Sequence, residues 1–552
     1  MNRKLRIGLL VNGYKIQAWK YQVIGKIYES DFAEIVCVIV SPVPEAVKGK
    51  GKHVLTSLLI RSVEKIDKLI FRTGNDYNAI KDVSDLIKNS PLLNHEPLTG
   101  EESIENIKRH KPDIIVKFGQ HNLTGEMLKI PRYGVWGYSA DKGKTYGITE
   151  PGFREVINYR PVTYSALEIQ NENPVHNNVL FETWESTCPF SINVNRNRIY
   201  WRTALFLPRI LYGLYKYQDN YLEQLKNRFQ RLKPEFDPGM EVPALLKVAK
   251  DLTKYFIRVA GLSLGKLYYT DAFSWKLLYN INRSRSYYFD NKNYKVISPP
   301  SDLFWADPFV VSNSDNYYVF VEEFIYSKDK AHISVLKLDN QGNLLESARV
   351  IERPYHMSYP FIFTIGSDYY MIPETCQNKT IELYKCTEFP WKWQFEKNIM
   401  ENLNAADTTL FHNDGIWWLF TALDQTDSIS GCSTELFLFY TDDVLSGEWK
   451  SHPMNPVVSD ARNARPAGNL FIGNGKIYRP SQDCSMRYGR GLNFNLVAVL
   501  TENEYHEELV TRIKPSWDKK LRGIHTINSD NALTMVDVYV FHERISSLIS
   551  PK

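Results

Sequence analysis

The sequence has little of several features that would indicate a function at once. Only six of its 552 residues are cysteine, and they show neither the paired spacing of a zinc site nor the density of a secreted disulfide framework. No apolar run approaches the roughly 18 residues of a membrane span. The net charge of +4 comes from interleaved acids and bases rather than from a charged block. We therefore expect reduced thiols, no transmembrane segment and no nucleic-acid partner.

Common catalytic signatures are missing as well. The chain has no Asp-x-Asp, which argues against the usual metal-dependent nucleotide-sugar transferase site, and no His-Glu-x-x-His. No Gly-x-Gly-x-x-Gly follows the first apolar run. We predict no metal site. The start MNRKLRIGLLVNG is too short in its apolar part for a signal peptide and lacks a small-residue cleavage site. The expected location is cytoplasmic, including the inner face of the membrane.

The N-terminal part has the pattern of an α/β domain. Residues 5–11 (LRIGLLV) and 34–41 (EIVCVIVS) are continuous apolar runs, and the segment between them has helical spacing of its apolar residues. This βαβ opening predicts a parallel sheet. A third run at 113–118 follows an amphipathic stretch, so its end lies at the carboxyl edge, where open α/β sheets bind ligands. We predict a Rossmann-like α/β domain over 1–182.

The pattern then becomes helical. Residues 202–229 and 242–262 repeat apolar side chains every three or four positions, so a mainly helical connector is expected over 183–271. One interpretation is a connector packed between domains. The other is a basic amphipathic surface that touches membrane lipid or a lipid-linked substrate.

The second half of the chain repeats. Residues 307–320, 359–371, 409–420 and 469–478 each read as strand, Asn/Asp/Gly turn, strand, and 525–541 is a weaker fifth copy. The spacing of roughly 50 to 60 residues is typical of a four-stranded propeller blade. We predict a five-bladed β-propeller over 272–552, closed by the strand Trp275–Tyr279 against the C-terminal hairpin.

Polar residues open each copy. Because the first strand of a blade lines the central channel, side chains at these positions converge, and second-strand ends add Glu322 or Glu323 and Gln482. Carboxylates bind pairs of sugar hydroxyls and aromatic faces stack on sugar rings, so a carbohydrate site is expected there. The catalytic candidates are Asp307, Glu374 and Asp483; the substrate-binding candidates are Tyr359, Asp407, Arg465, Arg479 and His525. The isolated His332, His356 and His412 are expected to be core or turn residues.

The stretch FWADPFV resembles the first-blade motif of the five-bladed glycosidases of the β-xylosidase and invertase type. That resemblance implies that Asp307 is a base or nucleophile. A second carboxylic acid would lie about 5 to 10 Å away across the scissile bond, and Glu374, Asp407 and Asp483 are candidates. The alternative is an Asp-Pro turn that starts a strand.

A second resemblance covers about 270 to 545. FWADPF, YHMSYPFIF with DYYMIPET, FPWKWQFEK, GIWWLF and RPAGNLF followed by GKIYRPSQDCSMRYGRGLNF resemble the propeller of glucosamine inositolphosphorylceramide glycosyltransferases and their bacterial relatives. This implies a carbohydrate setting. In the plant proteins the transfer domain is separate from the propeller, so the resemblance does not make the propeller a catalyst.

The N-terminal region resembles the 10-formyltetrahydrofolate-dependent formyltransferases in KPDIIVKFGQ, the loop at 134–147, PGFREVINYRPVTYSALEI and the strand Val179–Phe181. The family implies a strand ending in Asn-x-His and an Asp about forty residues later, which stabilise the oxyanion and manage the amine proton. Trp136-Gly-Tyr138 and Val175 stand at those positions. Formyl transfer by that mechanism, and 10-formyltetrahydrofolate as a cofactor, are therefore not expected.

We predict a transferase of cell-surface polysaccharide or glycoconjugate assembly. The α/β domain would hold a donor such as a sugar nucleotide, and the propeller would hold a carbohydrate or glycolipid acceptor. On the donor side, Asp141 is the catalytic candidate and the binding candidates are Trp136, Tyr138, Lys142 and Lys144. Three alternatives stay open: a non-catalytic glycan-binding protein on a retired formyltransferase scaffold, an amino-sugar N-formyltransferase with displaced residues, and a glycosidase.

Overall fold

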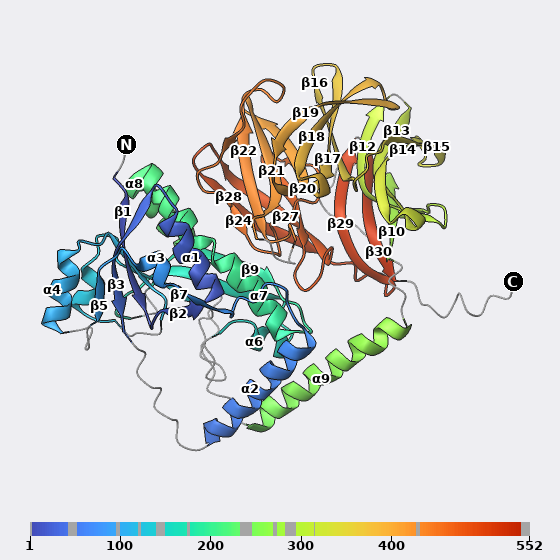
Figure 1. Cartoon of the computed structure of the whole chain (residues 1–552). Coiled ribbons are helices and arrows are strands. Elements are labelled where there is room, and N and C mark those ends of the chain that lie inside the picture. Colours follow the sequence, from blue (N-terminus) through green and yellow to red (C-terminus); the bar gives the residue numbers. More distant parts are fainter. Residues whose placement is uncertain are drawn as a thin grey trace. The chain divides into compact units, whose positions relative to one another are not determined.

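A computed structural model describes the chain at residues 3–41, 52–94, 100–119, 123–139, 150–173, 177–231, 245–268, 273–281, 294–313, 315–426, 431–530 and 532–541. By its contacts the chain divides into two compact units, Met1–Arg258 and Val259–Lys552 (Figure 1). The predicted limits at 182 and 271 stay predictions. By contacts, the helices between Ile192 and Arg231 belong to the first unit.

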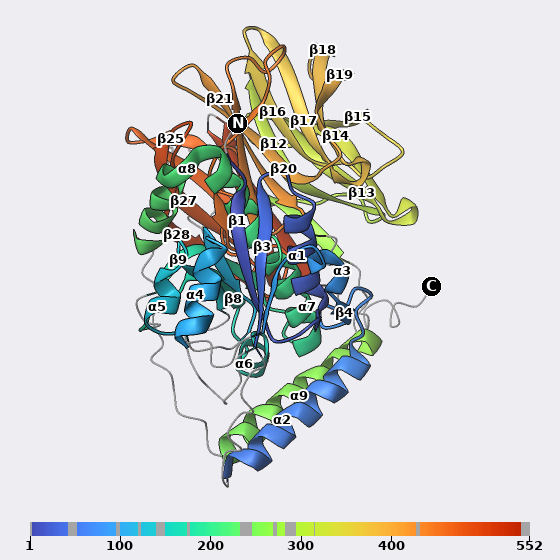
Figure 2. The ribbon, with the colours of Figure 1, turned by 60° about the vertical axis from the view of Figure 1, so that its left-hand side comes forward.

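The first unit is built on a seven-stranded sheet (Figure 2). Its order is β5 (Leu92–Asn94), β3 (Ala33–Val40), β1 (Leu5–Val11), β6 (Ile114–Lys117), β7 (Val135–Ser139), β8 (Val162–Ile169) and β9 (Asn178–Ser186). Strands β5 to β7 are parallel, and β8 and β9 run antiparallel to their neighbours. Central strands are apolar throughout because both faces are buried; Ile7 and Leu9 in β1 have no exposed surface. The predicted parallel sheet is confirmed.

Helices surround this sheet. They are α1 (Ala18–Tyr28), α2 (Lys52–Ile70), α3 (Ser84–Ile87), α4 (Glu101–Arg109), α5 (Glu126–Lys129), α6 (Phe153–Ile157), α7 (Ile192–Thr203), α8 (Phe206–Arg231) and α9 (Leu245–Tyr268), with a small ladder of β2 (Lys15–Gln17) and β4 (Ile80–Asp82). Phe206 of α8 packs on Phe181 of β9 with ring centroids 4.7 Å apart. Among the described helices, none is long and apolar enough to cross a membrane.

The second unit is a five-bladed β-propeller, as predicted. The first blade is β12 (Leu303–Asn313), β13 (Asn316–Ile325), β14 (Lys330–Asp339) and β15 (Leu344–Ile351); the second is β16 (Ser358–Ile365), β17 (Asp368–Thr375), β18 (Thr380–Glu388) and β19 (Lys392–Glu401). The third is β20 (Asn404–Asn413), β21 (Ile416–Asp424), β22 (Glu435–Thr441) and β23 (Lys450–Ser451), with β24 (Val458–Ser459). The fourth is β25 (Phe471–Gly473), β26 (Lys476–Asp483), β27 (Gly491–Leu500) and β28 (Tyr505–Ile513).

The fifth blade closes the ring with strands from both ends of the unit. Its order is β11 (Lys295–Ile297), β10 (Phe273–Ile281), β30 (Leu533–Phe541) and β29 (Leu521–Asp530). Strand β10 pairs with β30 from Phe273 opposite Phe541 to Ile281 opposite Leu533. The predicted closure by the strand at 275–279 is therefore confirmed, and it removes the open edge that an unclosed ring would carry.

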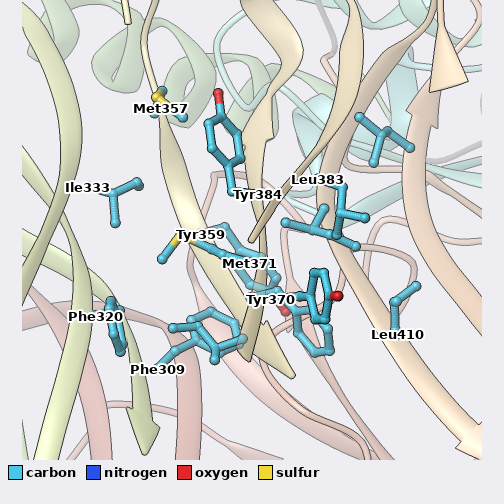
Figure 3. Close-up of a cluster of buried hydrophobic side chains, with 14 of the residues drawn as sticks. Phe309, Phe320, Ile333, Met357, Tyr359, Tyr370, Met371, Leu383, Tyr384 and Leu410 are labelled. Carbon is cyan, nitrogen blue, oxygen red and sulfur yellow. The ribbon is translucent and has the colours of Figure 1, made fainter. Parts of the chain in front are cut away.

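Neighbouring blades pack through aromatic and aliphatic side chains. Figure 3 shows Tyr359 of β16 among Phe309 of the first blade and Met371 of its own blade. The Phe309 and Tyr359 rings meet edge to face with centroids 4.8 Å apart. Because Tyr359 has no exposed surface, its ring is a core element, and only its hydroxyl group is left for polar contacts.

Candidate functional site

A repeated backbone feature places polar side chains at the propeller axis. In three blades the ladder between the first and second strand shifts register at Asp307, Tyr359 and Asp407. All three have positive φ, between 43° and 52°. This left-handed conformation is uncommon for residues with a side chain and marks a constrained site. In the fifth blade the corresponding shift falls at His525 and Thr526.

Asp307, His525 and Asp537 form a buried chain of charges between the first and the fifth blade. His525 Nε2 lies 3.2 Å from Asp307 Oδ1, and its Nδ1 lies 2.7 Å from Asp537 Oδ2. Asp537 also accepts backbone N–H groups of Asp307, His525 and Thr526 at 2.9 to 3.1 Å. Asp307 further accepts the Thr526 hydroxyl at 2.6 Å and the Tyr359 backbone N–H at 3.2 Å. Both oxygens of Asp307 are therefore engaged, and its side chain is only 4% exposed.

The electrostatics of this chain follow from burial. Burial opposes charging of the His525 imidazole, but Asp537 and Asp307 outweigh it and raise its pKa to about 9. Burial raises the pKa of Asp307 to about 7; His525 lowers it, and the neighbouring Asp407 and Asp537 raise it further. At neutral pH the imidazole is thus a cation that lies between the carboxyl groups of Asp307 and Asp537.

A second polar cluster lies around Arg465. Its guanidinium contacts both oxygens of Asp407, with Nε 2.6 Å from Oδ2 and Nη2 3.2 Å from Oδ1. Nη2 also lies 3.3 Å from Glu374 Oε2. Gln482 donates to Asp407 Oδ2 at 2.7 Å. Arg465 therefore binds carboxylates from the second and the third blade at once.

Burial raises the pKa of both carboxylic acids in this cluster. For Asp407 the value is about 7, with Arg465 lowering it and Glu374 raising it. The pKa of Glu374 is also raised by burial and lowered by Arg465. Asp407 is 2% exposed, whereas Glu374 and Arg465 are 15% and 12% exposed. Glu374 and Arg465 are thus the more accessible groups of this cluster.

Further groups border the axis at the same strand ends. Glu322 pairs with Ala306, and Glu374 with Ser358, each directly before a register shift. His356 Nε2 lies 3.3 Å from Glu322 Oε1, and its Nδ1 accepts the Ala331 N–H at 3.3 Å. Tyr488 is 46% exposed and lies 4.9 Å from the Arg465 guanidinium, over which its ring stacks. We call Glu322, His356, Glu374, Arg465 and Tyr488 the hub rim.

Three cysteines also surround this cluster. Cys376 packs against the buried Cys432, whose Sγ donates to the Asn404 carbonyl at 3.2 Å. A hydrogen bond with Cys432 lowers the pKa of Cys376, against burial and with help from Arg465. Burial raises the pKa of Cys484 to about 11, although Arg465 acts in the opposite direction. All six cysteines are free thiols.

The structure separates the predicted site residues into groups. Asp307, Tyr359, Asp407, Glu374, Arg465 and His525 meet at the axis, as described. Asp483 is buried and accepts the Ser485 N–H at 3.0 Å. Arg479 is fully buried and ion-paired with Glu507 of the outer strand β28 at 2.7 Å, which directs it away from the hub rim.

Of the predicted donor-side residues, the structure describes Trp136 and Tyr138. Trp136 has no exposed surface, and its Nε1 donates to the Tyr133 carbonyl at 2.8 Å, so it is a core residue. Tyr138 packs edge to face on Trp19, with centroids 5.2 Å apart. Asp141, Lys142 and Lys144, like Val175, lie outside the described residues.

Sequence reasoning missed Asp537 and Tyr488 and treated His356 as a turn or core residue. Asp537 carried a signal, because it is the one acidic residue in the apolar strand LTMVDVYVF. The local sequence does not predict the contact of Tyr488 with Arg465 or that of Cys376 with Cys432. Those relationships join different blades.

Within the described ranges, Asp307, His525 and Asp537 form a group that could hold a cation. Their ligand atoms all lie within 4.8 Å of one another. The protonated imidazole of His525 already neutralises part of the negative charge of the two aspartates. A bound proton is therefore enough to explain why these three side chains lie together. The prediction of no metal stays a prediction.

These features define a class of protein that has a five-bladed propeller with a carboxylate-rich axis and, in the same chain, a parallel α/β unit. Within this class, residues 293–533 match the family model described as Glucosamine inositolphosphorylceramide transferase 1, N-terminal. The protein named Glucosamine inositolphosphorylceramide transferase 1 from Oryza sativa subsp. japonica is 36% identical over 207 residues, which are 37% of this chain and 27% of the relative. The protein of the same name from Arabidopsis thaliana is 32% identical over 207 residues, with the same coverage. The chain thus matches about a quarter of the length of these relatives.

Solved structures similar to the propeller include the native Bacillus subtilis arabinanase Arb43A, with a TM-score of 0.31 and 14% identity over 44% of this chain and 95% of that one. The catalytic domain of the Coprinopsis cinerea GH62 alpha-L-arabinofuranosidase has a TM-score of 0.34 and 12% identity over 45% of this chain and 95% of that one. These likenesses are too weak to support a conclusion about activity.

Proposed function

We propose that this protein is a transferase in glycoconjugate assembly and that the hub rim binds the carbohydrate part of its acceptor. The observation that carries the proposal is the contact set of Arg465, which combines a guanidinium, the Glu374 carboxylate and the half-exposed Tyr488 ring at one place. A carboxylate and a guanidinium supply acceptors and donors for sugar hydroxyls, and an aromatic face stacks on a sugar ring. The family match of residues 293–533 supports the same carbohydrate setting.

The charge balance at the axis favours a basic sugar. The acidic side chains at the axis are Asp307, Asp407, Asp537, Glu322 and Glu374, and the basic ones are His356, His525 and Arg465, so acidic groups outnumber basic ones. A hexosamine with a free amino group carries a positive charge that this surplus attracts. The names of the matched relatives include glucosamine and inositolphosphorylceramide. We therefore propose a glycolipid that contains an amino sugar as the ligand.

The donor belongs to the α/β unit in this proposal. A sugar nucleotide would bind at the carboxyl edge of its parallel strands, the usual ligand position of such sheets. Asp141, Lys142 and Lys144 stay donor-side candidates that follow β7. Formyl transfer stays disfavoured because Trp136 and Tyr138 replace the polar pair that it needs.

A glycan-binding protein without catalysis is the second candidate. It is favoured by the state of Asp307, whose two oxygens are occupied by Thr526, His525 and the Tyr359 N–H. A glycosidase base or nucleophile must reach water or the anomeric carbon. Asp307 is 4% exposed and serves inter-blade contacts instead. This also weighs against the glycosidase alternative.

One experiment distinguishes the transferase from the non-catalytic glycan-binding protein. Binding of amino-sugar glycolipid headgroups and transfer from a panel of sugar nucleotides are measured on the full chain and on Glu374→Gln and Tyr488→Ala. Glu388→Gln, on the exposed outer part of the second blade, is the matched control. We expect both rim variants to weaken headgroup binding at least tenfold with unchanged melting temperature, and the control to bind normally. Binding without turnover of any sugar nucleotide would support the second candidate, and no headgroup binding would contradict both.

Membrane contact is the remaining part of the proposal. Helices α2 and α9 lie side by side in both views (Figures 1 and 2), and Tyr255 of α9 donates to Asp67 of α2 at 2.8 Å. Away from this contact, apolar residues such as Leu58, Leu69 and Ile257 are 54% to 68% exposed, beside exposed lysines. Exposed apolar side chains next to bases suit an anionic lipid surface. We propose that this helix pair brings the protein to a lipid-borne acceptor at the inner membrane face.

A further inference from the structure

The α/β sheet has a topological switch point between β1 and β6. From β1 the chain passes to β3 on one side, and it later returns to β6 on the other. The connections that leave the two carboxyl ends thus diverge. Open α/β sheets bind ligands at this kind of position, outside the carboxyl ends of the strands.

Lys20 bridges this switch point. It lies in the first turn of α1, which follows β1, and its Nζ donates to the carbonyl of Phe118, directly after β6, at 2.9 Å. This hydrogen bond uses one of the three ammonium protons. The ammonium group is therefore placed where both strands end, with donors to spare.

Aromatic rings hold this lysine in place. Its Nζ lies 5.5 Å from the Trp19 ring centroid, and Trp19 packs on Phe118 and Tyr138 with centroids 6.3 and 5.2 Å away. Tyr200 stacks on Trp19 with ring centroids 5.1 Å apart. Such packing limits side-chain motion, and a pre-positioned ammonium loses less entropy on binding.

No carboxylate neutralises Lys20 at contact distance among the described residues. The nearest acidic influence is Glu150, whose carboxylate lies 3.4 Å from Arg196. Burial lowers the pKa of Lys20 to about 8, and Glu150 raises it only in part. A half-buried ammonium without a counter-ion carries a desolvation cost that an anionic ligand would offset.

We propose that Lys20 is the anion-binding residue of a ligand site at the β1/β6 switch point and that it takes the phosphate groups of a nucleoside diphosphate. The inference deepens the proposed function, since a sugar nucleotide carries its charge on a diphosphate. It names a residue outside the loop of Asp141, Lys142 and Lys144.

A purely structural role is the competing explanation. Lys20 would then only satisfy the Phe118 carbonyl, and its removal would lower stability without changing anion affinity. Lys20→Gln is suited to this distinction because glutamine retains an N–H donor and loses the charge. Lys20→Met removes both.

The test is calorimetric titration of the full chain with pyrophosphate and with uridine diphosphate at pH 7. Lys15→Gln, an exposed lysine on β2, is the matched control. We expect Lys20→Gln and Lys20→Met to weaken both ligands at least tenfold, and Lys15→Gln to stay within twofold of the parent. We also expect the parent protein to lose affinity between pH 7 and pH 9, as the ammonium loses its proton.

Equal dissociation constants for the parent and Lys20→Gln would overturn the inference, and so would a parent protein that binds neither probe. If the variants fail to fold, the protection of Lys20 from acetylation in the parent protein tests the proposal instead. Pyrophosphate should slow acetylation of Lys20 at least fivefold relative to Lys15, measured by mass spectrometry, and unchanged rates overturn the proposal. Anion binding at Lys20 without any glycosyl transfer would retain this inference while the proposed function fails.

Discussion

The Nε2 atom of His525 in the fifth blade lies 3.2 Å from Oδ1 of Asp307 in the first blade. The two residues are far apart in sequence, yet they form a buried ion pair where the ring closes. Asp537 supports the pair from β30 through the other imidazole nitrogen, at 2.7 Å. The acid that resembles a glycosidase base is thus part of the closure of the propeller.

Asp307→Asn should act on stability first. Asparagine keeps the size of the side chain, but its amide nitrogen cannot accept one of the two hydrogen bonds that the Asp307 oxygens accept from Thr526 and Tyr359. A buried donor left without its acceptor costs about 1–3 kcal/mol. We expect a fall of that order in the free energy of unfolding, measured by chemical denaturation, while Glu388→Gln changes it by less than about 0.5 kcal/mol. A fully stable Asp307→Asn protein that has lost activity would instead make Asp307 catalytic.

The stability of the propeller should fall as pH rises. The pKa of His525 is raised from 6.5 to about 9, so its stabilising contribution is complete below pH 6.5 and is lost as pH rises through 9. The pKa of Asp307 is raised from 3.8 to about 7, so its contribution is largest below pH 3.8 and is lost as pH rises through 7. The shift at His525 corresponds to roughly 3 kcal/mol.

Melting temperatures between pH 6 and pH 10 check this expectation. In His525→Gln the part of the decline that extends to about pH 9 should be smaller, because the titrating imidazole is gone. Asp307, whose pKa His525 lowers, should then titrate at a higher pH than in the parent protein. A parent protein whose stability rises over this range would show that the assigned charges are wrong.

The stability of the propeller should depend on the shape of the Arg465 side chain as well as on its charge. Arg465→Ala leaves Asp407 and Glu374 facing each other without their shared cation, and we expect about 3–5 kcal/mol lower stability. Arg465→Lys keeps the charge but cannot contact both oxygens of Asp407 as a fork. Its loss should be smaller, with weaker headgroup binding. Arg349→Ala, at an exposed ion pair, is the control in the same denaturation series. Equal stability of all three variants would exclude a structural role for the fork.

Cys376 should be the most reactive cysteine of the second blade. Its pKa is lowered by the hydrogen bond with Cys432, whereas burial raises the pKa of Cys386 to about 11. Thiolates are the reactive form, so iodoacetamide at pH 7 should label Cys376 at least tenfold faster than Cys386, as followed by peptide mass spectrometry. Cys432→Ala should slow labelling of Cys376. Equal rates for the two thiols in the parent would refute the assignment.

The helix pair α2/α9 should bind anionic vesicles. Each lysine near such a surface contributes about 1 kcal/mol, so Lys250→Glu with Lys254→Glu should weaken co-sedimentation with phosphatidylserine vesicles at least tenfold. Binding should also weaken with added salt. Lys392→Glu with Lys450→Glu, at two exposed lysines of the propeller, is the charge-matched control. Equal binding to phosphatidylcholine vesicles would show that charge has no part in the contact.

The elements of the fold were predictable because they depend on local patterns. Apolar runs such as LRIGLLV, and the recurring strand-turn-strand copies, report burial and turns within a few residues of each other. The inward position of Asp307 and Asp407 followed from the same repeat. The ion-pair partners could not be predicted from this repeat. Arg465 pairs with carboxylates of two other blades, and Arg479 pairs with Glu507 on an outer strand. These ion pairs depend on how the blades are arranged around the axis, and no single segment of the sequence encodes that arrangement.

The pairing of β10 with β30 has a consequence for how the protein is made. Four blades emerge from the ribosome before residues 521–541, which supply the last strands together with His525 and Asp537. Until then Asp307 lacks its counter-ion, and the nascent ring keeps an unpaired edge open to chaperones and to other chains. Closure of the ring therefore waits for residues 521–541, the last part of the propeller to be synthesised, and only then can Asp307 meet His525.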